Sequence, residues 1–180
     1  MTTSRMYRLT GINLKSSPLG EADRLVTILS KEEGLIRAVA RGARKHTSRL
    51  RGRMEPFVVN DLLISRGRRA SQVDPHHSLQ WISQAETVQS FAKLGRSLAR
   101  LTAAQYLGEV ALQQALAGHP QEDLFLLLLE HLERIETAAS DRQILPLLTQ
   151  ALYHLLAVGG IAPQVHACHY CQHPLSENLP

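Results

Sequence analysis

The spacing of apolar residues changes near residue 90, and this change constrains the fold more than any other feature of the chain. Before it, short apolar runs are separated by clusters of Gly, Pro, Ser and Asn, a pattern typical of strands joined by turns. Five such runs are present, over residues 7–15, 25–29, 35–40, 57–65 and 79–88. They predict a small barrel or sandwich, and a five-stranded barrel of this size is typically an OB-fold. Gly34 follows two glutamates and predicts a tight turn between the second and third runs.

After Ser90 the apolar residues recur with the period of an amphipathic helix. The pattern predicts helices over residues 91–116, 124–135 and 145–158, with Gly118-His119-Pro120 between the first two and Gly159-Gly160 after the last. Three helices with short connections form a bundle. We therefore predict an α+β multidomain chain. An OB-fold barrel that binds nucleic acid covers residues 1–82, a helical domain covers 83–160, and a partial zinc-knuckle segment covers 161–180.

Charge is distributed unevenly along the chain. Residues 1–70 contain 15 Lys/Arg and 6 Asp/Glu, whereas residues 71–180 contain 5 Lys/Arg and 10 Asp/Glu. A basic half joined to an acidic half indicates a polyanionic partner for the basic part. The acidic half is better suited to protein contacts or to solubility.

The basic residues are concentrated in one stretch, which carries seven cations and no acid between Arg37 and Met54. Because neutralised phosphates release counterions, such a run predicts sequence-independent binding to nucleic acid. The alternative is a solvated charged loop without a ligand. A second basic turn follows after the fourth apolar run. The predicted phosphate contacts are Arg37, Arg41, Arg44, Lys45, Arg49, Arg51, Arg53, Arg66, Arg68 and Arg69.

Few aromatic side chains are available to stack on bases, since they make up 4% of the chain. This favours binding through the nucleic-acid backbone with little readout of bases. We expect Phe57 to lie in the barrel core and Trp81 in the core between the two domains. Asp23 or Glu21 is expected to accept hydrogen bonds from backbone amides in the turn between the first two strands.

Cys168 and Cys171 form a Cys-x-x-Cys pair near three histidines, His166, His169 and His173. Two thiolates three residues apart can hold zinc from one side, but tetrahedral zinc needs four ligands. Three alternatives follow: a local site that includes the histidines, a half-site completed beyond Pro180, or no metal. The half-site is the preferred interpretation. The absence of a surrounding βαβ pattern disfavours a redox pair.

Several functional classes have no support in the sequence. The longest apolar run, residues 124–129, is far shorter than the roughly 20 residues needed to cross a bilayer. The N-terminus also lacks the apolar core of a signal peptide. We expect a soluble cytoplasmic protein without membrane contact. No Gly-rich phosphate loop, Ser/His/Asp set or carboxylate cluster is recognisable, so we expect a protein without catalytic activity.

Two blocks occur in a specific order, Gly20-Glu21-Ala22-Asp23 and Arg41-Gly42-Ala43-Arg44-Lys45, and Cys168-His169-Tyr170-Cys171 follows much later. In this order the chain resembles the bacterial RecO family of recombination mediators over about residues 5–173. The resemblance implies an OB-fold, a helical domain and a zinc module. It departs from the family pattern in lacking the second cysteine pair, so we expect a C-terminally truncated chain.

The resemblance also implies a function. It predicts binding to single- and double-stranded DNA, annealing of complementary strands, and loading of a recombinase together with RecR, at the bacterial nucleoid. The helical domain would receive the acidic tail of single-stranded-DNA-binding protein beside a cation, and the cations available there are Arg100, Arg134 and Arg142. The alternative is an RNA-binding OB module without a role in recombination.

Overall fold

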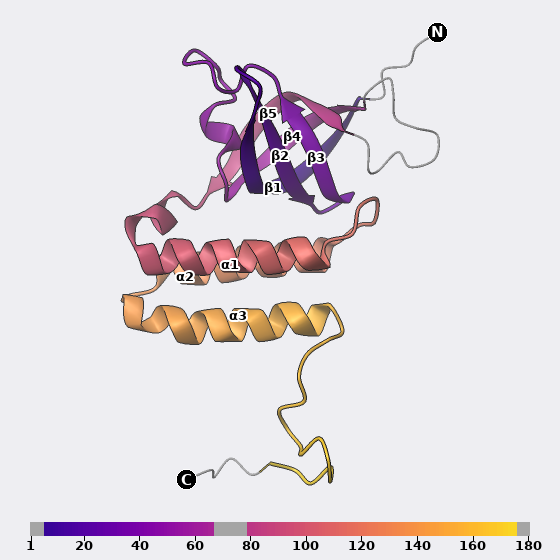
Figure 1. Cartoon of the computed structure of the whole chain (residues 1–180), viewed down its shortest axis with the longest axis vertical. Helices are drawn as coiled ribbons and strands as arrows, with labels where there is room; N and C mark the ends of the chain where they lie inside the picture. Colours follow the sequence, from indigo (N-terminus) through magenta and orange to yellow (C-terminus); the bar gives the residue numbers. More distant parts are fainter. Residues whose placement is uncertain (1–5, 67–78, 176–180) are drawn as a thin grey trace.

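The computed structural model describes residues 6–66 and 79–175, in which five strands lie above three α-helices (Figure 1). The mixed α+β architecture predicted from the sequence is therefore confirmed. The strands are β1 (Met6–Leu19), β2 (Asp23–Ser30), β3 (Gly34–Ala40), β4 (Val58–Arg66) and β5 (Gln80–Ser90). The helices are α1 (Leu98–Gln114), α2 (Glu122–Thr137) and α3 (Ile144–Val158).

The five strands close into a barrel in the order β1-β2-β3-β5-β4, with β4 paired back to β1. Neighbouring strands are antiparallel except β3 and β5, which run parallel where Val39 lies beside Trp81. Alternate side chains point inward because the side-chain period of a strand is two. The inward set forms a buried core that includes Leu9, Val26, Ile28, Ile36, Ala38, Leu62, Ile64 and Ile82.

The strand β5 continues to Ser90, so the domain boundary predicted after residue 82 falls inside it. A second apolar core joins the barrel to the helices. Its barrel members are Ile12, Leu14, Leu29, Phe57 and Val59, and its helical members include Leu107, Phe125, Leu128 and Leu132. The barrel and the helices therefore share one continuous core. Phe57 was expected in the barrel core, but it lies in this shared core, against Gly108 of α1.

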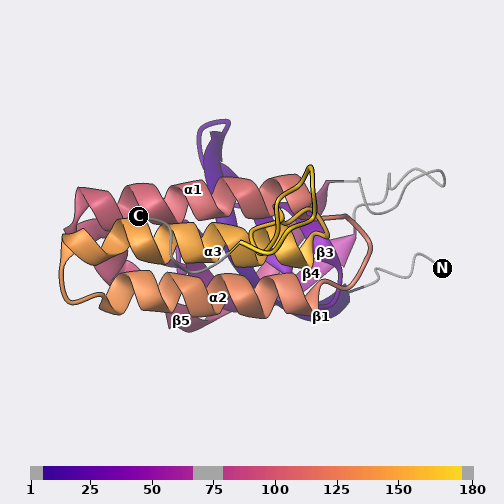
Figure 2. The same cartoon turned by 90° about the horizontal axis from the view of Figure 1, so that it is seen from below.

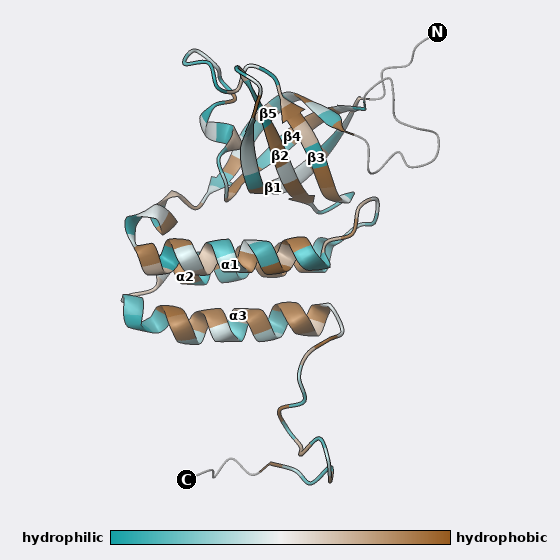
Figure 3. Ribbon diagram, in the orientation of Figure 1, coloured by the Kyte–Doolittle hydropathy of each residue, from teal (hydrophilic) through white to brown (hydrophobic). Residues whose placement is uncertain are grey.

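Helices α1 and α2 lie side by side beneath the barrel, and α3 lies below both of them (Figures 1 and 2). Helix α1 begins at Leu98, seven residues later than the sequence predicted, because Ser97 caps it by accepting a hydrogen bond from the Arg100 N–H. The residues before it form a 3₁₀ turn, Ala92–Arg96, whose Leu94 is buried in the shared core. Apolar residues occupy much of α3 (Figure 3). Within the described ranges no helix is long and apolar enough to cross a membrane.

The turn between β2 and β3 is joined to the connection between α1 and α2. The Leu35 N–H donates to the Leu116 carbonyl at 2.9 Å, and the Gly118 N–H donates to the Glu33 carbonyl at 2.9 Å. Gly34 lies between them with φ +65°, and a Cβ atom there would stand 2.1 Å from the Leu116 oxygen. This junction therefore requires glycine for both its backbone angle and its lack of a side chain.

Candidate nucleic-acid interface

The outer surface of β1, β2 and β3 carries a row of polar and cationic side chains. Val26 and Ile28 are buried inside the barrel, so Thr27 between them points outward. In the sheet register Thr27 pairs with Lys15 on β1 and with Arg37 on β3. The two cations thus flank one threonine across three strands. Lys15 was missed by the sequence analysis because it lies outside the dense basic stretch.

A row of mostly apolar side chains runs beside this cationic row. Leu25 pairs with Ser17 and with Val39, and Val39 lies beside Trp81 across the parallel β3–β5 pair. The Arg41 guanidinium carbon lies 3.9 Å from the centroid of the Trp81 ring. Trp81 was expected in the core between the domains. It lies instead on the outer wall of the barrel, because its neighbours along β5 occupy the inward positions.

The basic loop that follows β3 is attached to the β1–β2 turn at its start. The Gly42 N–H donates to the Asp23 carboxylate at 2.8 Å, and the Arg44 N–H donates to the Ala22 carbonyl at 2.9 Å. The Arg44 side chain also donates to the Gly20 carbonyl at 2.6 Å. Asp23 thus accepts from a backbone amide, as the sequence predicted, and it fixes the first residues of the loop.

The end of the same loop is fixed by two buried asparagines. Asn13 donates to the carbonyls of Arg53 and Glu55, at 2.8 and 3.0 Å, and Asn60 donates to the Arg53 carbonyl at 2.9 Å. The Arg53 guanidinium donates to the Ala85 carbonyl on β5. The loop therefore spans the end of the barrel between two anchored ends. Arg53 serves as one of the anchors.

The predicted phosphate contacts differ in their partners. Among the residues that the structure describes, no carboxylate forms an ion pair with the exposed cations Arg37, Arg41, Arg44, Lys45, Arg49 and Arg51. Arg51 contacts the His46 ring at 2.8 Å. The charges of these groups are therefore not neutralised by a carboxylate of the described residues, although Arg44 also donates to the Gly20 carbonyl and Arg41 lies over the Trp81 ring. We call Lys15, Arg37, Arg41, Arg44 and Lys45 the basic face. Of these five, Lys15 is paired with Glu109 of α1 at 4.0 Å.

Arg66 is engaged within the molecule. Its guanidinium forms an ion pair with Glu33 at 3.4 Å and lies 4.9 Å from the centroid of the Tyr7 ring. The other two cations of the predicted second basic turn, Arg68 and Arg69, lie outside the described residues.

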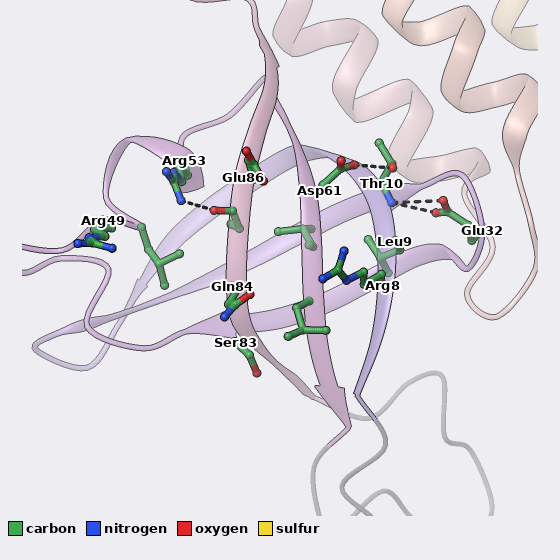
Figure 4. Close-up of a pocket in the computed structure, with 14 residues that line it drawn as sticks. Arg8, Leu9, Thr10, Glu32, Arg49, Arg53, Asp61, Ser83, Gln84 and Glu86 are labelled. Carbon is green, nitrogen blue, oxygen red and sulfur yellow. Dashed lines mark hydrogen bonds between the residues drawn. The ribbon is translucent and has the colours of Figure 1, made fainter.

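A groove of about 710 Å³ lies on another side of the barrel, over β1, β4 and β5 (Figure 4). Asp61 and Glu86 are direct cross-strand neighbours there, and Thr10 donates to Asp61 at 2.7 Å. Like charges so placed repel each other and any phosphate. The groove carries both signs of charge, from Arg8, Arg49 and Arg53 and from Glu32, Asp61 and Glu86. It is therefore a poorer surface for a polyanion than the basic face, and Arg49 lies on its edge.

Cys168 and Cys171 lie in a short hairpin after α3. The Cys168 N–H donates to the His173 carbonyl at 2.8 Å, and the Gln172 N–H donates to the Cys168 carbonyl at 2.9 Å. Hydrogen bonds from the backbone of Cys171 and of Tyr170 hold the pKa of the Cys168 thiol below its ordinary value. Within the described part of the chain no group of three or more His, Cys, Asp or Glu residues is placed to hold a metal ion. Cys168 and Cys171 are free thiols and supply two possible donors, whereas tetrahedral zinc needs four ligands.

Comparison with known proteins gives the family. The family model for the N-terminal part of recombination protein O matches residues 1–91, and the model for its C-terminal part matches residues 95–179. The chain is 65% identical over 170 residues to a DNA repair protein RecO of Synechococcus sp. (strain JA-3-3Ab). The aligned region covers 94% of this chain and 56% of that protein.

Two further curated relatives carry the same description. The identity is 52% over 174 residues with the protein of Gloeobacter violaceus, covering 97% of this chain and 63% of the relative. It is 47% over 178 residues with that of Nostoc sp. (strain PCC 7120), covering 98% and 57%. The chain thus spans between 56% and 63% of the length of these three relatives. With both family models matched along almost its whole length, the chain belongs to the RecO family.

Proposed function

We propose that this chain acts in DNA repair and recombination by binding single- and double-stranded DNA through the basic face. The observation that carries the proposal is a set of four exposed cations, Arg37, Arg41, Arg44 and Lys45, which form no ion pair with a carboxylate of the described residues and lie next to the half-buried Trp81. Arginine offers a planar fork that matches a phosphate, and lysine a point charge. The curated relatives are named DNA repair proteins, which supports the assignment.

The barrel would serve this function as an OB-fold. In that fold the surface of strands 2 and 3 and the adjoining loops bind oligonucleotides. Here the same strands carry Thr27 and Arg37, and the basic loop leaves the end of β3. The proposed binding surface therefore combines both features on one side of the barrel.

Strand annealing follows from the same charges. Two complementary strands repel each other through their phosphates. Cations that neutralise the phosphates of both strands lower this repulsion, so the strands can pair more readily. No chemical step is needed, so the proposed role is non-enzymatic.

We further propose RecR and the tail of single-stranded-DNA-binding protein as protein partners, and the cytoplasm at the nucleoid as the place of action. For the tail, Arg134 is already paired with Glu130 at 2.6 Å and Arg100 with Asp141 at 3.7 Å, whereas Arg142 is exposed.

Charge reversal tests the proposed surface. Arg37→Glu/Lys45→Glu is expected to weaken binding of labelled single-stranded and duplex DNA, measured by fluorescence anisotropy, and to do so equally for all sequences. The matched control is Arg96→Glu/Arg142→Glu, which removes the same charge from exposed positions in the helical part. Equal loss in both variants would mean that net charge alone matters and would overturn the assigned surface.

The same titration distinguishes DNA from RNA. Unlabelled RNA of the same sequence is added as a competitor to the DNA complex. A DNA-repair role predicts that DNA competes at least as well as RNA. Displacement by RNA at much lower concentration would support the alternative of an RNA-binding OB module.

We also propose that Cys168 and Cys171 form half of a zinc site. When bound, zinc would supply structural stability to this segment. Cobalt titration tests the assignment, since thiolate ligands give an intense absorption band in the near ultraviolet. Cys168→Ser should lose that band, and an unchanged spectrum would exclude the cysteine as a ligand.

A further inference from the structure

We propose that Trp81, together with Arg41, forms a stacking site for one unpaired base on the basic face. This inference rests on the proposed DNA-binding function and adds to it a preference for single strands over duplex. The sequence interpretation predicted contacts to the nucleic-acid backbone with little readout of bases. The position of Trp81 gives the barrel an aromatic surface among those contacts.

The placement of Trp81 follows from the register of β5. Its chain neighbours Gln80 and Ile82 are buried at 2% and 5% exposure, so the indole between them points outward. The indole is half-buried and lies beside Val39, which itself pairs with Leu25. Trp81 therefore ends an outward row in which Val39 is fully covered at 0% exposure, so the indole is the apolar surface that this end of the row offers to a ligand.

Cations adjoin this row. Arg37 and Arg41 are two residues before and two residues after Val39, so Arg37 lies on the same outer face of β3 and Arg41 immediately follows the strand. Both are exposed, and neither forms an ion pair within the described ranges. A nucleotide on this surface would meet an aromatic ring with a cation on either side. This combination is the one used by proteins that bind single strands without sequence preference.

Arg41 covers the ring in the free protein, with its guanidinium carbon 3.9 Å from the ring centroid. An exposed contact between a cation and an aromatic ring is weaker than the stacking of a base on that ring. A base can therefore take the place of the guanidinium, and the released Arg41 can contact the adjoining phosphate. Arg41 would thus keep the indole covered until a strand arrives.

Duplex DNA cannot use this site. Its bases are paired and stacked on both sides, so their faces are not available to a protein side chain unless the base leaves the helix. A duplex would contact the phosphate-binding cations alone. The stacking site therefore adds affinity for single strands only.

Intrinsic fluorescence provides a direct test, because Trp81 is the only tryptophan of the chain. The full chain is titrated with a labelled thymidine oligonucleotide, with an abasic oligonucleotide of the same length and charge, and with duplex. Label anisotropy reports binding and indole emission reports stacking. Binding of the thymidine strand should quench the emission, whereas the abasic strand and the duplex should bind with little quenching.

Two substitutions complete the test. Trp81→Leu should weaken binding of the thymidine oligonucleotide between about fivefold and a hundredfold and leave binding of duplex unchanged. Trp81→Phe keeps a ring and should recover most of the lost affinity, which a merely structural role would not predict. Circular dichroism of each variant verifies that the fold is retained.

The outcomes separate this inference from the function on which it rests. Thymidine strands that bind without quenching, and equally well to Trp81→Leu, would overturn the stacking site and leave the DNA-binding role intact. Failure of every oligonucleotide to bind would overturn both.

Discussion

At the scale of single residues, Gly34 shows that local sequence predicts the backbone conformation of a position but not its contacts with distant parts of the chain. The turn after Glu33 is readable from the sequence, and φ +65° at Gly34 confirms it. The approach of the Leu116 carbonyl is not readable, because it depends on a segment about 80 residues later in the chain. Trp81 shows the same limit. Its strand was predicted, but the partner strand that decides what lies beside the indole could not be.

Gly34→Ala is expected to destabilise the protein by more than about 3 kcal/mol. The new methyl group would meet the Leu116 oxygen at 2.1 Å and the His119 oxygen at 2.5 Å, so the junction between the barrel and the helices must open. Urea unfolding followed by circular dichroism measures the change.

Gly160→Ala is the matched control for that substitution. Gly160 has φ +73°, and no atom lies within 4 Å of the position that an alanine methyl group would take, so alanine there costs only the backbone strain of about 1–2 kcal/mol. Equal destabilisation by the two substitutions would show that the close contact at Gly34 has no energetic importance.

At the scale of elements, all five strands and all three α-helices of the described residues overlap the predicted ranges. Periodicity succeeded because each element has one buried side, and burial repeats with the geometry of the element. Boundaries were less accurate. The residues between Phe91 and Ser97 have apolar spacing that fits a helix, but Phe91 and Leu94 are buried against the barrel and draw the chain into a 3₁₀ turn.

The packing of α2 on α3 is expected to depend on pH through a histidine pair. His131 is buried, and its Nε2 lies 3.1 Å from Nδ1 of His154. Burial, then His154 and Arg134, lowers the pKa of His131, while Glu130 acts weakly in the opposite direction. The unfolded chain therefore binds this proton first as the pH falls through about 6.5. The contribution of His131 to the free energy of unfolding should be fully present above that pH. Below it the contribution should decline, by at most about 1.4 kcal/mol per pH unit for one proton.

His131→Gln is the variant that isolates this contribution. Denaturant midpoints at pH 7.5 and pH 5.5 are measured for both proteins. The difference between the two pH values should be smaller in the variant, since glutamine does not titrate. Parallel pH profiles would assign the acid sensitivity to other groups.

At the scale of the whole molecule, the shared core predicts that barrel and helices unfold together. Leu107 is fully buried in the core that also contains Ile12 and Phe57 of the barrel. Leu107→Ala should destabilise the protein by about 2–5 kcal/mol. The midpoint of unfolding should fall by the same amount whether it is followed by the fluorescence of Trp81, which reports the barrel, or by the circular dichroism of the helices. Separate shifts would show two independent domains, as the predicted boundary at residue 82 implied.

The uneven charge of the whole chain predicts how its DNA affinity responds to salt. If the cations of the barrel contact phosphates and the acidic helical part stays clear of them, the logarithm of the binding constant falls linearly with the logarithm of salt concentration. Each lost contact reduces the steepness by about 0.7 for single strands and about 0.9 for duplex. Arg37→Glu/Lys45→Glu removes two contacts, so the slope should become shallower by roughly 1.4 and 1.8 respectively. Arg96→Glu/Arg142→Glu leaves the contacts in place and should keep the original slope, because distant charge is screened at physiological salt. A parallel change of slope in both variants would place the bound strand across the helices as well as the barrel.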